Sequence, residues 1–179
     1  VIKMAKGFDM HVIAKGKRED KRLARKLGFR YVSLPELLKK SDIITIHVPL
    51  NDKTRYLINK KNIKMIKKGA YLINTARGEI VDTSALLWAL DRGVLAGGGL
   101  DVLEGEEEVR DEQELLRDNL ISKRDMKVLL ENHALIKEKN VIVTPHCGFY
   151  TKEALERILD VSAENIRGFV KGKIKNKVV

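Results

Sequence analysis

Three residues that could carry chemistry each follow a segment that predicts a β-strand. Arg77 follows the apolar run 70–73, Glu106 follows 95–102, and His146 follows 141–143. In an open α/β sheet, ligands bind just beyond the carboxyl ends of the strands. An arginine there can hold a carboxylate, an acid can tune a neighbouring pKa, and a histidine can transfer a proton near neutral pH. This combination predicts redox chemistry on a small 2-keto or 2-hydroxy acid.

The elements that must position these residues alternate between strand and helix. Apolar runs predict strands at 10–14, 29–32, 43–48, 70–74, 95–102 and 141–144, and residues 1–6 resemble the end of a helix. Helical spacing and capping residues predict helices at 18–27, 33–40, 60–66, 83–91 (capped by Thr83) and 151–171. The continuous apolar character of 43–48 indicates a strand covered on both faces. The alternation predicts parallel crossovers and an α/β fold with a doubly wound parallel sheet.

Residues 107–139 interrupt this alternation. The stretch is polar and rich in acids and bases, with helical spacing of its leucines. We interpret it as an insertion of loop and short helices between two strands. The chain of 179 residues is long enough for one domain and shows no composition typical of a linker, so we expect a single domain over 1–179.

Composition excludes several classes of protein. A hydrophobic content of 44% and a charged content of 34% are typical of a globular protein rather than a disordered one. No apolar stretch is long enough to span a bilayer, and the first residues lack the pattern of a signal peptide. Cys147 is the sole cysteine, which excludes an internal disulfide and fits a cytoplasmic location.

The net charge of +10 could attract nucleic acid. The lysines are scattered along helices, however, and the aromatic content of 5% leaves no basic run interleaved with rings for base stacking. We therefore expect neither a nucleic-acid partner nor a membrane partner, and no metal site.

Four motifs, spaced in order along almost the whole chain, carry a resemblance to a known family. They are His47-Val48-Pro49-Leu50, Asn74-Thr75-Ala76-Arg77-Gly78, Gly99-Leu100-Asp101-Val102 with Glu106, and Thr144-Pro145-His146. Together they resemble the D-isomer-specific 2-hydroxyacid dehydrogenases. The pair Phe149-Tyr150 and the long segment before Val141 make the D-lactate dehydrogenases the most similar branch.

The resemblance implies a Rossmann-type NAD-binding domain that lacks its first strand and glycine-rich loop, with the C-terminal helix 151–171 retained. It also implies that the substrate domain is absent and that the full-length enzyme is a homodimer. A glycine-rich loop and a helix N-terminus normally hold the pyrophosphate. We therefore expect the chain to be part of a longer enzyme and to be inactive alone.

The same resemblance assigns roles to individual residues. It implies that His146 is the general acid, that Glu106 orients it and raises its pKa, and that Arg77 binds the substrate carboxylate. Residues expected to bind the cofactor are Val48, Pro49, Thr54, Thr75, Ala76, Arg77 and Asp101, the last through the nicotinamide amide. Phe149 and Tyr150 are expected to shape the substrate pocket.

The chain departs from the family pattern at two places. In many relatives a proline follows the catalytic acid, whereas Glu107 follows it here. After 12–14 the family normally supplies an acid that binds the adenosine ribose, but here Lys15, Gly16, Lys17 and Arg18 follow. These cations could accept a 2′-phosphate and favour NADP, or a shortened turn could bring Glu19 or Asp20 into place. We retain NAD as the expected cofactor, with NADP as the alternative.

Three functions remain open from the sequence. The first is a nicotinamide-dependent oxidoreductase acting on a D-2-hydroxy acid and its 2-keto acid, as in the pair D-lactate and pyruvate. The second is a dinucleotide-responsive, corepressor-like binding module that keeps the same fold. The third is a truncated and inactive product.

Overall fold

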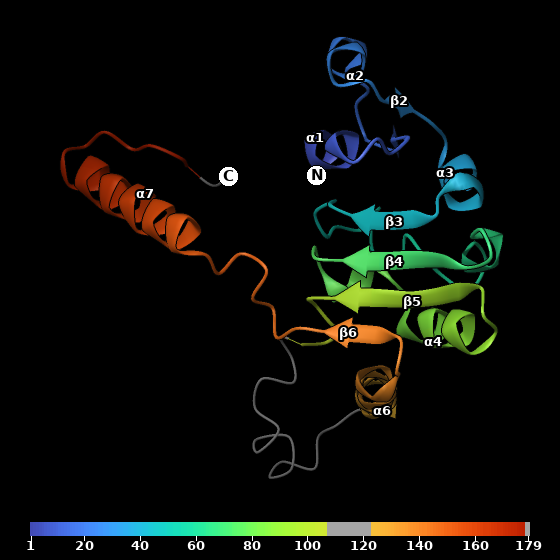
Figure 1. The fold of residues 1–179 in the computed structure, drawn as a ribbon. Coiled ribbons are helices and arrows are strands. Elements are labelled where there is room, and N and C mark those ends of the chain that lie inside the picture. The colour runs from blue at the N-terminus through green and yellow to red at the C-terminus, as the bar shows by residue number, and fades with distance from the viewer. Residues whose placement is uncertain (107–122, 178–179) are drawn as a thin grey trace. The chain divides into compact units, whose positions relative to one another are not determined.

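A computed structural model gives the fold of residues 1–106 and 123–177. The chain forms two compact units, Val1–Val143 and Thr144–Val179 (Figure 1). The first unit contains the sheets and the hydrophobic core. The second contains a loop and one long helix.

The main sheet of the first unit consists of β3 (Ile43–Ile46), β4 (Ala70–Asn74), β5 (Leu95–Leu100) and β6 (Val141–Val143), arranged in that order (Figure 1). All neighbouring strands are parallel, which confirms the predicted sheet. Asn74 pairs with Ile46 on one side and with Leu100 on the other, and Leu100 pairs with Val143. The carboxyl ends of these strands therefore meet at one edge of the sheet.

A smaller parallel sheet pairs β1 (Ile13–Ala14) with β2 (Arg30–Tyr31), and α2 (Lys21–Leu27) connects them. Both strands are shorter than predicted. Before them lies α1 (Ile2–Gly7), as expected from the sequence. After them, α3 (Leu34–Lys40) begins at Ser33, whose Oγ accepts a hydrogen bond of 3.3 Å from the Glu36 amide. The predicted N-terminal cap of this helix is confirmed.

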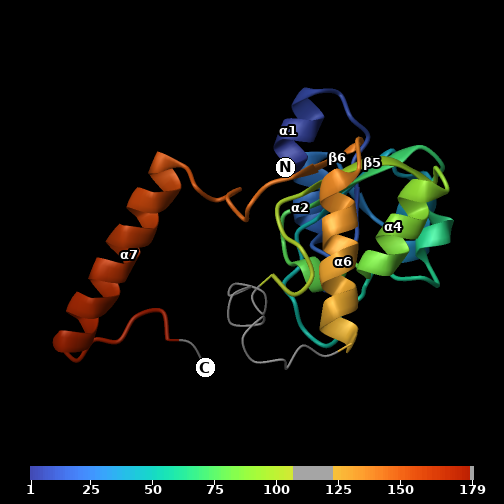
Figure 2. The same cartoon turned by 90° about the horizontal axis from the view of Figure 1, so that it is seen from below.

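The hydrophobic core lies on one face of the main sheet. Helices α4 (Thr83–Asp91) and α6 (Lys123–Lys137) pack against each other there (Figure 2). Buried members of this core come from α3, the strands, α4 and α6, and include Leu38, Ile44, Leu72, Leu86 and Leu135.

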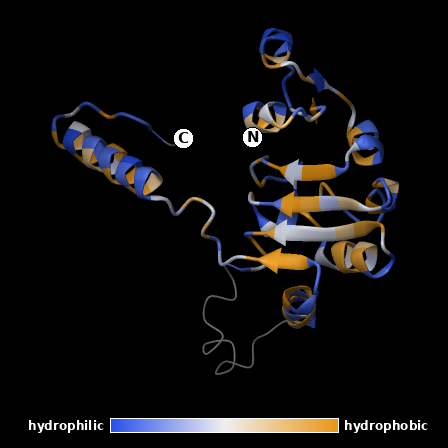
Figure 3. Ribbon diagram, in the orientation of Figure 1, coloured by the Kyte–Doolittle hydropathy of each residue, from blue (hydrophilic) through white to orange (hydrophobic). Residues whose placement is uncertain are grey.

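Within the described residues of the first unit, the opposite face of the sheet carries exposed apolar side chains, whereas the apolar run 43–48 predicted a strand covered on both faces. Ile44 and Ile46 are buried, but Ile43, the first residue of β3, is 50% exposed. Its neighbour in register, Tyr71, is 49% exposed, and Ile142 is 72% exposed. The prediction was made from hydropathy, and β3 is largely hydrophobic (Figure 3), but hydropathy does not show which of its side chains are buried.

Two helix predictions were wrong in detail. Residues 60–66 contain only the short 3-10 helix η1 (Ile63–Met65). The side chains of Asn59 and Asn62 accept hydrogen bonds from backbone amides, and these bonds compete with the hydrogen bonds of an α-helix. The cap of α4 is Asp82 rather than Thr83, since Asp82 Oδ1 accepts from the Ala85 amide at 3.1 Å.

The segment predicted as an insertion lies partly outside the described residues, which omit 107–122. From residue 123 on, the chain forms the helix α6 of 15 residues. Leu135 is buried in the core, and the Asn132 side chain donates to the Glu104 carbonyl at 2.9 Å. This part of the segment therefore packs on the sheet.

The second unit contains α7 (Lys152–Val170), which matches the predicted C-terminal helix. Thr151 caps it by accepting a hydrogen bond of 3.2 Å from the Ala154 amide. None of its side chains is buried, and apolar residues along it are exposed, including Ile158, Leu159, Ile166 and Phe169 (Figure 3). Among the described helices, none has the length and apolar character required to cross a membrane.

Candidate active site

Arg77 lies in a turn that the side chain of Asn74 closes. Asn74 ends β4 and is 1% exposed. Its Oδ1 accepts from the Ala76 amide at 3.1 Å, and its Nδ2 donates to the Arg77 carbonyl at 2.8 Å. The Arg77 side chain is exposed and donates to the Ala76 carbonyl at 2.7 Å. The turn therefore presents a guanidinium beyond the carboxyl end of a buried strand.

Glu106 lies at the end of the loop that follows the neighbouring strand, β5. The Asp101 amide donates to the Asn74 carbonyl at 2.9 Å, so the two strand ends remain paired where the loops begin. Asp101 is buried, with 6% of its surface exposed. Glu106 Oε2 accepts from the Leu103 amide at 2.9 Å, which curls the loop back on itself.

Gly78 brings these two loops into contact. A Cβ atom at Gly78 would lie 2.0 Å from the Leu103 carbonyl carbon and 2.3 Å from the Glu104 amide nitrogen. Only glycine permits such an approach between two backbones. The partner in this approach is the loop that carries Glu106. The structure therefore places the loops of Arg77 and Glu106 side by side.

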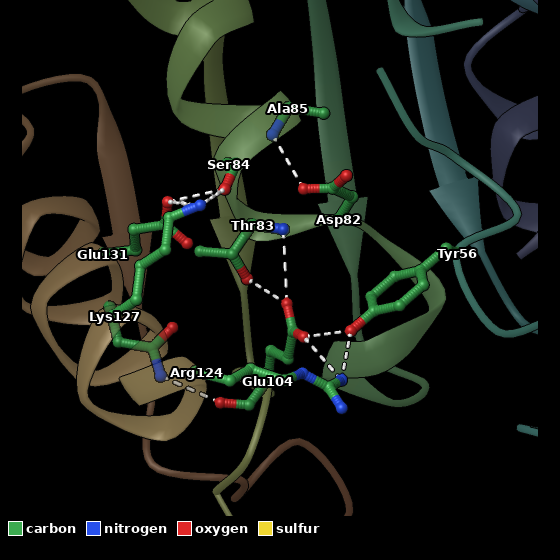
Figure 4. A network of polar contacts seen from close by, with 10 residues as sticks. Tyr56, Asp82, Thr83, Ser84, Ala85, Glu104, Arg124, Lys127 and Glu131 are labelled. Carbon is green, nitrogen blue, oxygen red and sulfur yellow. Dashed lines mark hydrogen bonds and ion pairs between the residues drawn. The ribbon is translucent and has the colours of Figure 1, made fainter. Parts of the chain in front are cut away.

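Glu104 is the centre of a polar network beneath this loop (Figure 4). The sequence places it in an acidic run typical of a solvated loop, but it is only 7% exposed. Its Oε2 accepts from the Thr83 hydroxyl at 2.8 Å and from the Thr83 amide at 3.3 Å. Its Oε1 accepts from the Tyr56 hydroxyl and lies 4.0 Å from the Arg124 guanidinium. The network anchors the Glu106 loop to the start of α4.

Tyr56 contributes its hydroxyl group to this network, and its backbone is left-handed, with φ of 51°. Its hydroxyl accepts from Arg124 Nη2 at 2.9 Å while donating to Glu104. Burial raises the pKa of Tyr56, the hydrogen bond to Glu104 adds to the rise, and Arg124 opposes it. The protonated phenol is therefore the form that the fold favours, and it can donate to the carboxylate.

A second group of contacts joins α4 to α6 beside this network (Figure 4). The Ser84 hydroxyl donates to Glu131 Oε1 at 2.5 Å and accepts from Lys127 Nζ at 3.0 Å. The two helices that frame the loop are thus tied together by polar side chains as well as by the apolar core.

The residues expected to contact a dinucleotide follow β3, β4 and β5 at the shared edge of the sheet. Val48 and Pro49 follow β3, Thr75 and Ala76 follow β4, and Asp101 follows β5. Thr54 shapes the loop after β3, because its hydroxyl donates to the Pro49 carbonyl at 2.6 Å and accepts from the Asn51 amide at 2.8 Å. The roles of these residues toward a cofactor stay predictions.

His146 lies in the second unit, three residues after the end of β6. Its backbone is left-handed, with φ of 51°, and its amide donates to the Thr144 carbonyl at 2.9 Å. The ring centroids of His146 and Phe149 lie 6.3 Å apart in a T-shaped arrangement. Those of Phe149 and Tyr150 lie 5.9 Å apart, also T-shaped. Phe149 and Tyr150 are both exposed. The convergence of His146 with Arg77 and Glu106, and the substrate-pocket role of the rings, stay predictions.

Sequence reasoning missed three residues that position this site: Asn74, Glu104 and Tyr56. Asn74 could have been found, since a polar residue that ends a buried strand must satisfy its amide. Glu104 and Tyr56 interact across 48 residues of sequence. Nothing local to either residue predicts that contact.

The adenosine end of the expected cofactor site fits less well. Lys15 follows β1, and Lys15, Lys17 and Arg18 are exposed. Asp20 Oδ1 caps α2 by accepting from the Leu23 amide at 2.8 Å, so this acid already has a structural role. The residues next to the strand end thus offer cations where ribose hydroxyls would require an acid.

Comparison with known proteins supports the fold and the motifs together. Residues 1–148 match the family described as D-isomer specific 2-hydroxyacid dehydrogenase, NAD binding domain. The chain is 37% identical over 179 residues to a glyoxylate reductase from Aeropyrum pernix, covering 100% of this chain and 47% of that protein. It is 41% identical to a D-specific alpha-keto acid dehydrogenase from Enterococcus faecium, covering 94% of this chain and 48% of that one.

A solved structure shows the same relationship. The D-lactate dehydrogenase from Aquifex aeolicus, complexed with NAD and lactic acid, superposes with a TM-score of 0.83 at 38% identity, covering 96% of this chain and 50% of that one. The chain spans about half the length of the curated relatives it matches. The chain belongs to the D-isomer-specific 2-hydroxyacid dehydrogenase family and corresponds to its NAD-binding domain.

Proposed function

We propose that this chain is the nucleotide-binding part of an oxidoreductase that interconverts a D-2-hydroxy acid and its 2-keto acid, as in the pair D-lactate and pyruvate. The observation that carries the proposal is the contact at Gly78. It holds the loop of a carboxylate-binding residue, Arg77, against the loop of an acid, Glu106, at the ligand-binding edge of the sheet.

Three residues of the chain would have separate roles in the reaction. Arg77 would bind the substrate carboxylate through its planar fork and fix the C2 carbon. During oxidation the substrate hydroxyl would release its proton to His146, and Glu106 would stabilise the imidazolium that forms. A bound nicotinamide dinucleotide would accept the hydride that leaves C2. In reduction His146 returns the proton to the carbonyl oxygen.

The test compares His146→Ala with His133→Ala in the full-length protein that carries this chain. His133 is an exposed histidine of α6 and serves as the matched control. Loss of a general acid lowers kcat by about 10²- to 10⁴-fold. We expect that loss for His146→Ala, with the Kd for the dinucleotide unchanged and with His133→Ala behaving as the parent. An unchanged kcat for His146→Ala would refute the acid role.

A second measurement addresses substrate binding. Arg77→Lys keeps the positive charge but removes the fork that matches a carboxylate. We expect a higher KM for the 2-keto acid and an unchanged Kd for the dinucleotide. A protein that binds dinucleotide, turns over no 2-keto acid and captures peptides only when NADH is present would instead support the corepressor-like function.

Cellular setting and assembly belong to the same proposal. We propose that the full-length protein is a cytoplasmic homodimer that binds neither nucleic acid nor membranes. The sole cysteine and the pattern of scattered lysines support this. Light scattering on the full-length protein would give its mass, and a monomer would refute the dimer.

A further inference from the structure

We infer that Glu104 is a positioning residue for Glu106 and that it acts together with Tyr56. Both residues affect turnover only through the Glu106 carboxylate, whose direction they fix. The inference rests on the proposed dehydrogenase function, in which Glu106 stabilises the imidazolium that forms during proton transfer.

Glu104 and Gly105 are the central residues of a tight turn that begins at Leu103 and ends at Glu106. The Glu106 amide donates to the Leu103 carbonyl at 3.4 Å, and the Leu103 amide donates to Glu106 Oε2 at 2.9 Å. Gly105 has φ of 72°, a conformation that favours glycine at the third position of a turn. Because Glu106 is the last residue of this turn, the placement of the turn sets the direction of its carboxylate.

Contacts from three other parts of the first unit hold Glu104 within the turn. Its Oε2 accepts from the hydroxyl and the amide of Thr83 at the start of α4. Its Oε1 accepts from the hydroxyl of Tyr56, which lies in the loop after β3. Its carbonyl accepts from Asn132 Nδ2 of α6 at 2.9 Å. The side chain and the backbone of Glu104 are therefore both fixed, two residues before Glu106.

The arrangement requires the charged carboxylate of Glu104. Its oxygens accept from Thr83 and Tyr56, and the Arg124 guanidinium lies 4.0 Å from Oε1. A glutamine side chain has the same shape, but one of its ends is an NH2 group that donates rather than accepts. Glu104→Gln therefore deprives either the Thr83 amide or the Tyr56 hydroxyl of its acceptor, and the turn loses one of its anchors.

Arg77 is held by different contacts, which separates turnover from substrate binding. Both ends of the Asn74 side-chain amide close the Arg77 turn, at 3.1 Å and 2.8 Å. These bonds do not involve Glu104 or Tyr56. Displacement of Glu106 should therefore lower kcat while the KM for the 2-keto acid changes little.

The test is a double-mutant cycle between Glu104 and Glu106 in the full-length protein, with pyruvate and NADH as substrates. Misplacement of a catalytic group by about 1 Å can cost about 10²-fold in rate, so we expect Glu104→Gln to lower kcat about 10- to 100-fold. In the Glu106→Gln background the same substitution should lower kcat less than about twofold, because residues that act as a unit have non-additive effects. A fall in kcat that is equal in both backgrounds overturns the inference, as does an unchanged kcat for Glu104→Gln.

Tyr56→Phe repeats the cycle with a milder change and decides it if Glu104→Gln does not fold. The substitution removes one hydrogen bond and leaves the Thr83 contacts in place. We expect kcat to fall about 3- to 10-fold in the parent, as for loss of about one hydrogen bond, and to stay unchanged in the Glu106→Gln background. Equal falls in the two backgrounds would overturn the inference here too.

Ser84→Ala is the matched control for a loss of stability. Ser84 also joins α4 to α6 through polar contacts, but its partners are Glu131 and Lys127 rather than the Glu106 turn. This variant should keep the parent kcat. A fall in kcat equal to that of Tyr56→Phe would indicate a general structural effect and would overturn the inference.

The dehydrogenase function can fail separately. If the parent reduces no 2-keto acid, that function is refuted, and amide hydrogen exchange measured by NMR decides the inference. The amides of Leu103 and Glu106 both donate within the turn, so their exchange should be at least about tenfold faster in Tyr56→Phe and unchanged in Ser84→Ala. Unchanged exchange at both amides in Tyr56→Phe would overturn the positioning role.

Discussion

At the scale of single residues, Glu104 determines how the Glu106 loop is held. Its carboxylate accepts hydrogen bonds from the start of α4 and from Tyr56, and it is almost fully buried. Removing a buried acceptor leaves its donors unsatisfied, which costs more than the bond itself contributed. The network should therefore be important for stability as well as for the geometry of the loop.

Substitution of this carboxylate should be costly. We expect Glu104→Ala to lower the free energy of unfolding by about 2–3 kcal/mol, because the Thr83 donors and the Tyr56 hydroxyl lose their acceptor in a buried site. Urea unfolding followed by circular dichroism measures the change. The control Glu138→Ala removes an exposed acid and should stay within about 0.5 kcal/mol of the parent. Equal effects of the two variants would contradict a structural role for Glu104.

Tyr56 should make stability depend on alkaline pH. Its pKa in the folded chain lies above the ordinary value of 10.0, chiefly because of burial and then because of its hydrogen bond to Glu104. A pKa raised by folding contributes stability that is present below the unfolded pKa and is lost as pH rises through the folded pKa. We expect the parent to lose stability relative to Tyr56→Phe above about pH 10. Parallel pH profiles of unfolding for the two proteins would refute this.

Sequence reasoning located the residues near strand ends better than the remote residues that support them. Arg77 was predicted from a strand end and Asp101 from the resemblance, and both follow strands in the structure. The burial of Glu104 was not predicted, because a run of acids has the composition of a solvated loop. The partners that permit burial come from remote parts of the chain, and a single sequence gives no measure of that proximity.

At the scale of elements, the contact between the loops after β4 and β5 depends on the absence of a side chain at Gly78. The nearest atoms to a Cβ there are backbone atoms of Leu103 and Glu104. Backbone atoms cannot rotate away as a flexible side chain can. A methyl group would therefore push apart the two loops that carry Arg77 and Glu106.

Alanine at this glycine should separate the loops. We expect Gly78→Ala to lower the free energy of unfolding by about 3 kcal/mol or more, since overpacking against backbone requires the loops to move. Gly7→Ala is the matched control, because no atom lies within 4 Å of a Cβ at Gly7 in α1. Differential unfolding in urea compares the two variants. If both unfold like the parent, the close packing at Gly78 is unimportant for stability.

Most elements could be predicted because their determinants are local. The Ser33 cap, the Thr151 cap and the apolar run of β4 lie within the segments that they define. The 3-10 helix at 63–65 and the one-sided burial of β3 were not predicted. The first depends on asparagine side chains that compete for amides, and the second on which helices cover the sheet.

At the scale of the whole molecule, the sequence predicted the parallel sheet and the family but not the division into two units. The boundary falls between Val143 and Thr144, inside a motif that also contains Pro145 and His146. Composition shows no linker there, so nothing in the sequence marks the change. The buried apolar side chains of residues 1–106 and 123–177 all lie before this boundary, in the first unit.

The order of the main sheet has a consequence for biosynthesis. Each strand of β3-β4-β5-β6 pairs with the strand that follows it in the chain. A ribosome releases residues from the N-terminus onward, so β4 can pair with β3 before β5 has been translated. No later strand has to insert between two strands that have already paired. Nascent chains with such nearest-neighbour pairing expose the unpaired backbone groups of each strand edge only until the next strand emerges, which shortens the period in which aggregation competes with folding.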